Sequence, residues 1–236
     1  REIVDYMATE SLVQYIHNKT NLPQDQLRFI FKMMDKQNFD FTKAETEAIL
    51  DSLEKVKILD PACGSGAFPM GVLQKIVQAL EKLDPDAEWW KKRQIDRVRR
   101  ASKNAIVTKM FAEKLESGNP EYARKIGVIQ NSLYGVDIQP VAAEISKLRC
   151  FLSLVVDENI DENKPNRGIE PLPNLEFKFV TADTLISLPE KNTQEQLNKK
   201  GKKSITELEK DLDKVRQEYI QSFGEGKILL KQKFED

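Results

Sequence analysis

Residues 60–66 place a carboxylate and two glycines where they could hold a small charged ligand. The apolar residues between Val56 and Leu59 predict a short buried strand that stops at Asp60, and a glycine-bearing turn follows it. A helix is predicted to begin near Phe68. Such a junction directs backbone N–H groups at a ligand, and glycine lets that ligand approach the backbone closely. The sequence therefore predicts a ligand-binding turn between a strand and a helix.

Two phosphate-binding motifs use a turn of this kind, and neither fits. A dinucleotide fingerprint reads Gly-x-Gly-x-x-Gly, but Pro69 occupies the third glycine position after Gly64 and Gly66. A P-loop needs a lysine where this chain has Val72. The remaining ligand class has an amino acid and a nucleoside but no phosphate, and S-adenosylmethionine meets this description. Asp60 could then face the amino group while the turn amides face the carboxylate.

The segment Asp-Pro-Ala-Cys-Gly-Ser-Gly-Ala-Phe, residues 60–68, closely resembles motif I of the N6-adenine DNA methyltransferases of the gamma arrangement. The resemblance implies an α/β fold, a Rossmann-like S-adenosylmethionine-dependent methyltransferase half-sheet of three strands. It also implies cofactor contacts by Asp60, Pro61, Ala62, Cys63, Gly64 and Gly66. The alternative is a glycine turn of purely structural use.

Two further predicted strands end close to a carboxylate. Residues 133–138 form the second strand, which ends at Asp137, and residues 177–180 form the third, which Asp183 follows. In a doubly wound sheet, ligands bind at the carboxyl ends of the strands. The segments resemble motifs II and III, which implies a ribose contact for Asp137, an adenine contact for Ile138 and a hydrogen bond from the adenine amine to Asp183. The alternative for Asp137 is a cap on the following helix.

The first 55 residues have the apolar periodicity of helices. Pro23 suits the start of a second helix, and Thr42 with Glu45 forms a capping box for a third. Residues 1–7 resemble the tail of motif X, whose preceding part helps to hold the methionine end of the cofactor in the family. Because that part is missing, we expect the chain to be a portion of a longer enzyme.

Two later segments also have helical periodicity. The helix predicted from Pro140 to Val155 repeats apolar residues at intervals of three and four, so we expect this face to pack against the sheet. These residues are Val141, Ile145, Leu148, Leu152 and Val155. Residues 194–223 are predicted to form an amphipathic helix, and residues 157–174 a surface loop.

A charged insertion separates the first two strands. In it, Trp89 and Trp90 precede a basic run that only Asp96 opposes. The run consists of Lys91, Lys92, Arg93, Arg97, Arg99, Arg100 and Lys103. Basic side chains beside aromatic rings can neutralise phosphates and stack on bases, so residues 89–103 are the best local candidate for DNA contact. The alternative is a solvated helix face.

The insertion also contains Asn119-Pro120-Glu121-Tyr122, which resembles the catalytic Asn-Pro-Pro-Tyr of the family. Its position between motifs I and II is not where the family places that loop, and residues 114–118 cannot form a buried strand. A helix with Pro120 in its first turn is the simpler interpretation. We therefore expect no catalytic residue in this chain, and no metal site.

Composition gives only broad limits. Charged residues make up 32% of the 236 residues and the formal net charge is -1, so there is no global argument for nucleic-acid binding. The two cysteines, Cys63 and Cys150, have no disulfide-like spacing, which favours a reducing compartment. No apolar run approaches the roughly 20 residues that span a bilayer, and no leader opens the chain. We expect a soluble, cytoplasmic protein of unknown oligomeric state.

These patterns predict three regions. Residues 1–55 form a helical N-terminal region, residues 56–190 an S-adenosylmethionine-binding core with a helical insertion at 84–130, and residues 191–236 a helical extension. The predicted function is the cofactor-binding portion of an adenine-specific DNA methyltransferase, from a type IIG restriction–modification or phage-defence system. It should be inactive alone, since these residues lack Asn-Pro-Pro-Tyr. The alternatives are a methyltransferase acting on RNA or protein, and a non-enzymatic DNA-binding module.

Overall fold

A computed structural model of the chain describes residues 2–32, 40–101, 109, 112–113, 115–116, 118–158, 162–163, 167 and 175–186. The chain divides into two compact units, of which the first comprises residues 1–99 and 104–184 and the second residues 100–103 and 185–236. The elements below belong to the first unit, apart from the last two residues of α5.

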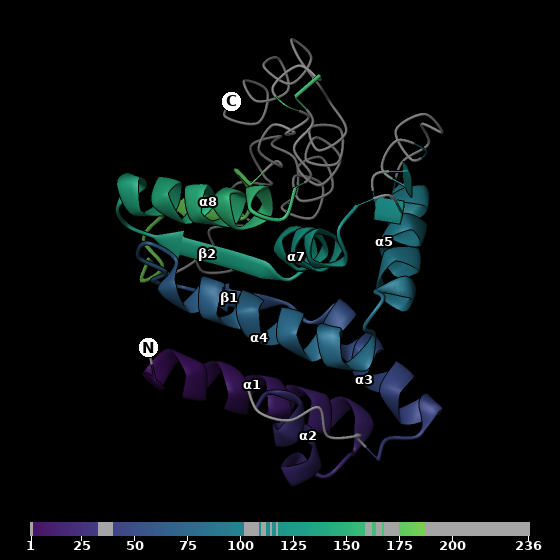
Figure 1. Cartoon of the computed structure of the whole chain (residues 1–236). Helices are drawn as coiled ribbons and strands as arrows, with labels where there is room; N and C mark the ends of the chain where they lie inside the picture. Colours follow the sequence, from purple (N-terminus) through teal and green to yellow (C-terminus); the bar gives the residue numbers. More distant parts are fainter. Residues whose placement is uncertain are drawn as a thin grey trace, which may run out of the picture. The chain divides into compact units, whose positions relative to one another are not determined.

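The predicted N-terminal helices are confirmed as α1 (Glu2–Thr20), α2 (Gln24–Ile30) and α3 (Lys43–Lys55). Helix α1 packs on both α3 and α4 (Ala67–Leu83), and an ion pair of 2.7 Å joins Asp5 to the buried Lys75 of α4. Figure 1 shows α1 and α2 on the far side of α4 from β2. Lys75 also donates to the Phe31 carbonyl at 3.1 Å, so its charge is held on two sides.

The capping box at the start of α3 is confirmed. Thr42 donates to the Glu45 carboxylate from both its backbone N–H, at 2.8 Å, and its hydroxyl, at 2.7 Å. The Glu45 N–H donates back to the Thr42 hydroxyl at 3.3 Å. These hydrogen bonds to the charged form lower the pKa of Glu45. The first turn of α3 is therefore fixed by two reciprocal caps.

Thr42→Ala is expected to lower the free energy of unfolding by about 1 kcal/mol, because the first turn of α3 loses its side-chain cap. Urea unfolding followed by circular dichroism measures the loss. The matched control is Thr46→Ala, inside the same helix, where alanine is the better helix former and should be neutral or stabilising. Equal losses in the two variants would contradict a capping role.

Three short parallel strands form the sheet in the described residues. They are β1 (Ile58–Asp60), β2 (Leu133–Asp137) and β3 (Phe179–Thr181), in the order β1-β2-β3. In this register Asp60 pairs with Gly135, and Asp137 with Thr181. The third strand starts later than residue 177, where it was predicted, because residues 176–178 form a turn in which the Lys178 N–H donates to the Leu175 carbonyl at 2.9 Å. The observed class is a mixed α/β fold with parallel strands.

Helices α4, α7 (Pro120–Asn131) and α8 (Pro140–Val155) pack on the sheet and on one another (Figure 1). Leu133, Gly135 and Phe179 are buried beneath them. A Cβ on Gly135 would lie 2.7 Å from the Phe179 ring and 2.9 Å from the Cys63 sulfur, so no side chain fits there. Leu59 and Val180 alternate with these residues along the strands and are exposed.

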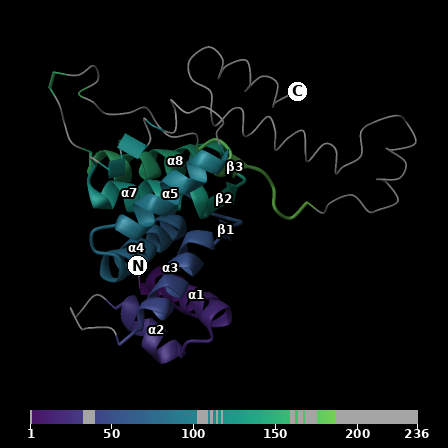
Figure 2. The same ribbon diagram turned by 90° about the vertical axis from the view of Figure 1, so that its right-hand side faces the viewer.

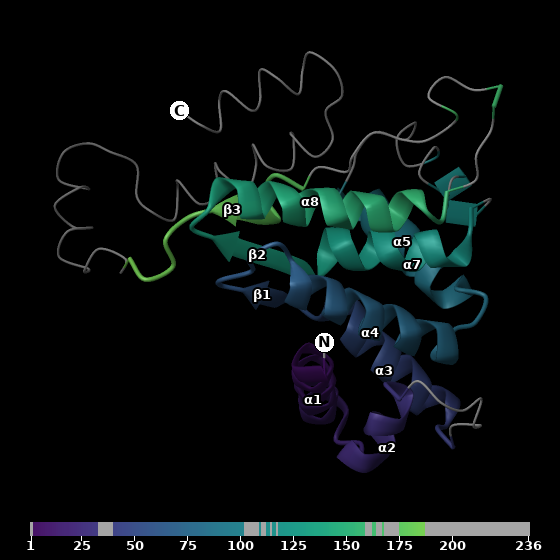
Figure 3. The same ribbon diagram turned by 60° about the vertical axis from the view of Figure 1, so that its left-hand side comes forward.

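The face of α8 that was predicted to meet the sheet does not do so. Four residues of this apolar stripe, Val141, Ile145, Leu148 and Leu152, are between 40% and 68% exposed, and the fifth, Val155, is half-buried. The face that packs inward instead carries Ala143, Ser146, Cys150 and Leu154. Because these inward residues are mostly small, α8 can approach the glycine turn closely. Figure 3 shows α8 beside β3 and β2. The prediction was wrong because α8 has two apolar stripes and periodicity cannot choose between them.

The aromatic pair in α5 (Glu88–Ala101) is also used differently from the prediction. Trp90 is only 1% exposed, and its indole N–H donates to the Ala123 carbonyl of α7 at 3.0 Å. Two of the basic residues join α5 to α3, since Arg93 pairs with Asp51 and Arg97 with Glu54. Figure 2 shows α5 with the neighbouring helices. Trp90 therefore cannot stack on a base, and two of the seven basic residues attach α5 to α3.

The interpretation of residues 119–122 as a helix start is confirmed. Asn119 is the N-cap of α7, and its side-chain oxygen accepts from the Glu121 N–H at 3.0 Å, with Pro120 as the first helical residue. Most of the predicted loop at 157–174 and all of the predicted helix at 194–223 lie outside the described residues. Among the helices that are described, none has the length and hydrophobicity needed to cross a bilayer.

Candidate cofactor-binding site

The glycine turn lies between β1 and α4, where the sequence predicted it. Gly64 and Gly66 have φ values of 52° and 82°, in the left-handed region that favours glycine. A Cβ on Gly64 would meet nothing within 4 Å, whereas one on Gly66 would lie 2.9 Å from the Ser146 hydroxyl oxygen. One side of the turn is thus open at Gly64, and the other side is pressed against α8.

Asp137, at the end of β2, holds the turn in place. One carboxylate oxygen accepts from the Gly64 N–H at 2.7 Å, and the other accepts from the Gln139 N–H at 2.9 Å. The Cys63 N–H donates to the Val136 carbonyl at 2.9 Å. The capping alternative for Asp137 is not supported, because Gln139 is the N-cap of α8 and no side chain caps this helix. The same carboxylate also joins the second strand to the glycine turn.

The end of β3 reaches the same place. The Ala182 N–H donates to the Asp137 carbonyl at 3.0 Å, and the Thr184 hydroxyl donates to the Pro61 carbonyl at 3.2 Å. Ile138 and Asp183 are both exposed at this edge. On β1, the Asp60 carboxylate accepts from the Ala62 N–H at 3.1 Å, which fixes the first bend of the turn. The structure therefore brings all the predicted strand-end residues to one edge of the sheet.

The N-terminus of α4 leaves backbone donors at this edge. Gly66, the N-cap of α4, provides no side-chain cap, and Pro69 has no N–H to satisfy. The first N–H groups of a helix have no partner within it, and they carry the positive end of the helix dipole. Ala67 and Phe68 supply these donors here. The arrangement suits an anionic group, which could be the carboxylate of an amino acid.

The cysteine in the turn is part of the packing. Cys63 is 5% exposed, and burial raises the pKa of its thiol, with further contributions from the charges of Asp60 and Asp137. Cys150 lies on the inward face of α8, where burial raises its pKa to about 12. Both cysteines are free thiols. A thiol with a raised pKa is a poor nucleophile at neutral pH, so Cys63 fills space beneath the turn.

Three contacts to the turn were not predicted from the sequence. Ser146 donates from its hydroxyl to the Gly64 carbonyl at 3.1 Å, Arg149 donates to the Ser65 carbonyl at 3.0 Å, and Thr184 reaches Pro61. A small polar residue at 146 is not a distinguishing signal, because Ser153 in the same helix is also small and polar and donates to Cys150 instead. No spacing rule links a helix after the second strand to the turn after the first.

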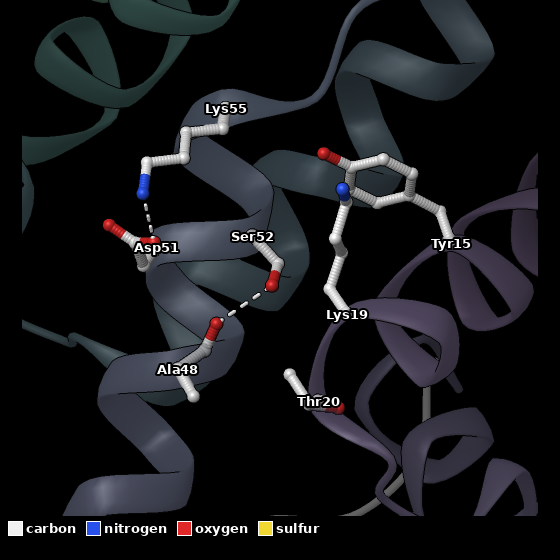
Figure 4. Close-up of a pocket in the computed structure, with 7 residues that line it drawn as sticks. All are labelled: Tyr15, Lys19, Thr20, Ala48, Asp51, Ser52 and Lys55. Atoms are coloured by element: carbon white, nitrogen blue, oxygen red, sulfur yellow. Dashed lines mark hydrogen bonds and ion pairs between the residues drawn. The ribbon is translucent and has the colours of Figure 1, made fainter.

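A separate hollow of about 450 Å³ lies between α1 and α3 (Figure 4). Its walls include Tyr15, Lys19 and Asp51, and none of the predicted cofactor residues. Burial acts to raise the pKa of Asp51, but the ion pairs with Lys55 and Arg93 outweigh it and lower that pKa. The hollow is therefore a polar contact region between two helices, apart from the glycine turn.

A parallel α/β sheet with its helices on one side and a glycine turn after the first strand corresponds to a portion of a methyltransferase fold. Residues 131–235 match the protein family described as Eco57I restriction-modification methylase. The match includes β2, α8 and β3 but not the glycine turn. Over these residues the chain is similar to restriction–modification methylases.

A curated relative agrees with this family match. A putative type II restriction enzyme and methyltransferase of Methanocaldococcus jannaschii is 34% identical over 148 residues, which is 63% of this chain. The aligned part is 10% of that protein, so the chain spans a small fraction of the relative's length. No solved structure matches the chain.

Proposed function

We propose that this chain is the cofactor-binding portion of a DNA methyltransferase that transfers a methyl group from S-adenosylmethionine to N6 of adenine. The main support is the Asp137 carboxylate, which joins the second strand end to the glycine turn through the Gly64 N–H at 2.7 Å. The resemblance of the turn to motif I and the family match over residues 131–235 support the same class. The proposal that adenine is the methyl acceptor rests on the resemblance of residues 60–68 to motif I.

Each predicted contact has a chemical reason in this proposal. Each oxygen of the Asp137 carboxylate accepts one backbone N–H, and a carboxylate offers about four lone-pair positions, so capacity remains for ribose hydroxyls. Asp60 would face the cofactor's amino group, and the turn amides its carboxylate. The exposed Ile138 would cover the adenine, while Asp183 would accept from the adenine amine. S-adenosylmethionine would supply the methyl group.

DNA is the proposed partner of the whole enzyme. Of the basic residues in the described part of α5, Lys92, Arg99 and Arg100 are exposed, so they are the candidates for phosphate contacts. The target adenine would have to leave the duplex stack to be methylated. We also propose the division into regions 1–55, 56–190 and 191–236. The chain alone should not methylate DNA, and adenine methylation by it would contradict this expectation.

Isothermal titration with S-adenosylmethionine tests the cofactor assignment. We expect saturable binding, and no binding of NAD or ATP, because the turn lacks the features of the two phosphate-binding motifs. An absence of heat at millimolar S-adenosylmethionine would contradict the proposal and favour a non-enzymatic module. The acceptor is tested by expressing the whole gene and searching the host DNA for N6-methyladenine. Cofactor binding without any methyladenine would favour the RNA or protein alternative.

A further inference from the structure

We propose that Ser146 is a positioning residue for the cofactor site. Its hydroxyl orients the peptide between Gly64 and Ser65, so that the Ser65 N–H is directed at the carboxylate of the cofactor's amino-acid part. This inference rests on the proposed function, since it assigns a ligand group to that amide. It goes further because it gives α8 a role in recognition of the cofactor.

Ser146 is built into the contact between α8 and the turn. Its side chain is 1% exposed, and its hydroxyl donates to the Gly64 carbonyl at 3.1 Å. A Cβ on Gly66 would lie 2.9 Å from the Ser146 hydroxyl oxygen and 3.3 Å from its Cα, so the helix and the turn are in direct contact. A buried hydroxyl is costly unless it is hydrogen-bonded. Here its partner is the backbone of the turn.

The planarity of the peptide bond links this buried contact to the open side of the turn. The Gly64 carbonyl and the Ser65 N–H belong to one peptide unit, and in a trans peptide they point in opposite directions. Because the carbonyl is directed at Ser146, the N–H is directed away from α8. Within the described part of the chain this N–H has no hydrogen-bond acceptor. A Cβ on Gly64 would meet nothing within 4 Å, so the approach to the turn is clear.

Arg149 holds the next peptide from the same helix. Its guanidinium donates to the Ser65 carbonyl at 3.0 Å, and the Gly66 N–H donates to the Cys63 carbonyl at 2.8 Å. Arg149 is exposed, so its contribution should be smaller than that of the buried Ser146. The two side chains lie nearly one helical turn apart on α8. Together they fix two consecutive carbonyls of the turn from one side.

The chemistry of the cofactor makes the inference specific. A backbone N–H needs an acceptor, and an anionic acceptor forms the strongest hydrogen bond. In S-adenosylmethionine and S-adenosylhomocysteine the carboxylate belongs to the amino-acid part, whereas 5′-methylthioadenosine has the same nucleoside without it. Loss of the Ser146 hydroxyl should therefore weaken the binding of S-adenosylmethionine and S-adenosylhomocysteine. The binding of 5′-methylthioadenosine should stay nearly unchanged.

The test compares Ser146→Ala with the wild-type chain by titration with S-adenosylhomocysteine and with methylthioadenosine. We expect affinity for S-adenosylhomocysteine to fall by roughly five- to tenfold, as for one lost hydrogen bond. Affinity for methylthioadenosine should change by less than about twofold. The matched control is Ser153→Ala, on the same helix, because the Ser153 hydroxyl donates to the Cys150 carbonyl at 2.7 Å and does not touch the turn.

The titrations distinguish a failure of the proposed function from a failure of the inference about Ser146. If the wild-type chain binds neither ligand, the proposed function and this inference both fail. If the wild type binds but Ser146→Ala weakens both ligands equally, or neither, the inference fails and the proposed function stands. Should Ser146→Ala not fold, Ser146→Cys keeps the size of the side chain but has a weaker donor, and we expect the same selective loss at about two- to threefold. An unselective loss in Ser146→Cys would also overturn the inference.

Discussion

Asp137→Ala is expected to lower the affinity for S-adenosylmethionine by roughly a hundredfold or more, because the proposed site would lose two hydrogen bonds from ribose hydroxyls to a charged acceptor. The substitution also removes the acceptor of the Gly64 N–H, at 2.7 Å, and of the Gln139 N–H, at 2.9 Å. The turn should loosen as well, with a fall of about 1–3 kcal/mol in the free energy of unfolding. Isothermal titration and urea unfolding measure the two effects.

The matched control for this prediction is Asp25→Ala, which removes the same group from an exposed ion pair with Arg28 on α2. It should leave cofactor affinity unchanged. A third variant, Asp137→Asn, separates the two roles of the carboxylate, since the amide keeps one acceptor oxygen but loses the charge. We expect it to bind more weakly than wild type and more tightly than Asp137→Ala. Wild-type affinity in Asp137→Ala would exclude Asp137 from the ribose site.

Trp90→Ala is expected to lower the free energy of unfolding by about 3–5 kcal/mol, as large-to-small substitutions of a buried aromatic residue do. Trp90 is 1% exposed, and its indole N–H donates to the Ala123 carbonyl at 3.0 Å. The indole nitrogen also lies 2.8 Å from the position a Cβ on Gly127 would take, so the ring fills the contact between α5 and α7 without spare room. Chemical unfolding of the purified chain measures the change.

The neighbouring residue provides the control. Trp89 is half-buried and its ring stacks on the Arg93 guanidinium, whose Cζ lies 5.0 Å from the ring centroid. Trp89→Ala should therefore cost much less stability than Trp90→Ala. If both substitutions left stability unchanged and weakened DNA binding, the original expectation of a DNA-stacking pair would hold, and our assignment of Trp90 to the core would be wrong.

Local sequence signals predicted most elements that carry the site. The strands that end at Asp60 and Asp137, and the helix with Pro120 in its first turn, were placed correctly, because each depends on residues within a few positions of one another. The convergence of the strand ends followed from a general rule, since parallel strands present their carboxyl ends at one edge. The start of β3 was less accurate, because the turn at residues 176–178 leaves no pattern of its own.

The sequence by itself determined the type and order of the elements around the turn, and the position of its glycines, because hydrophobic period, caps and φ preferences are local properties. Only the tertiary structure decided which face of α8 packs inward, and with it that Ser146 and Arg149 contact the turn. It also decided that Trp90 belongs to the core. These features depend on contacts between segments far apart in the chain. Local periodicity could not predict them, because α8 has apolar residues on two faces and both faces fit a helical pattern equally well.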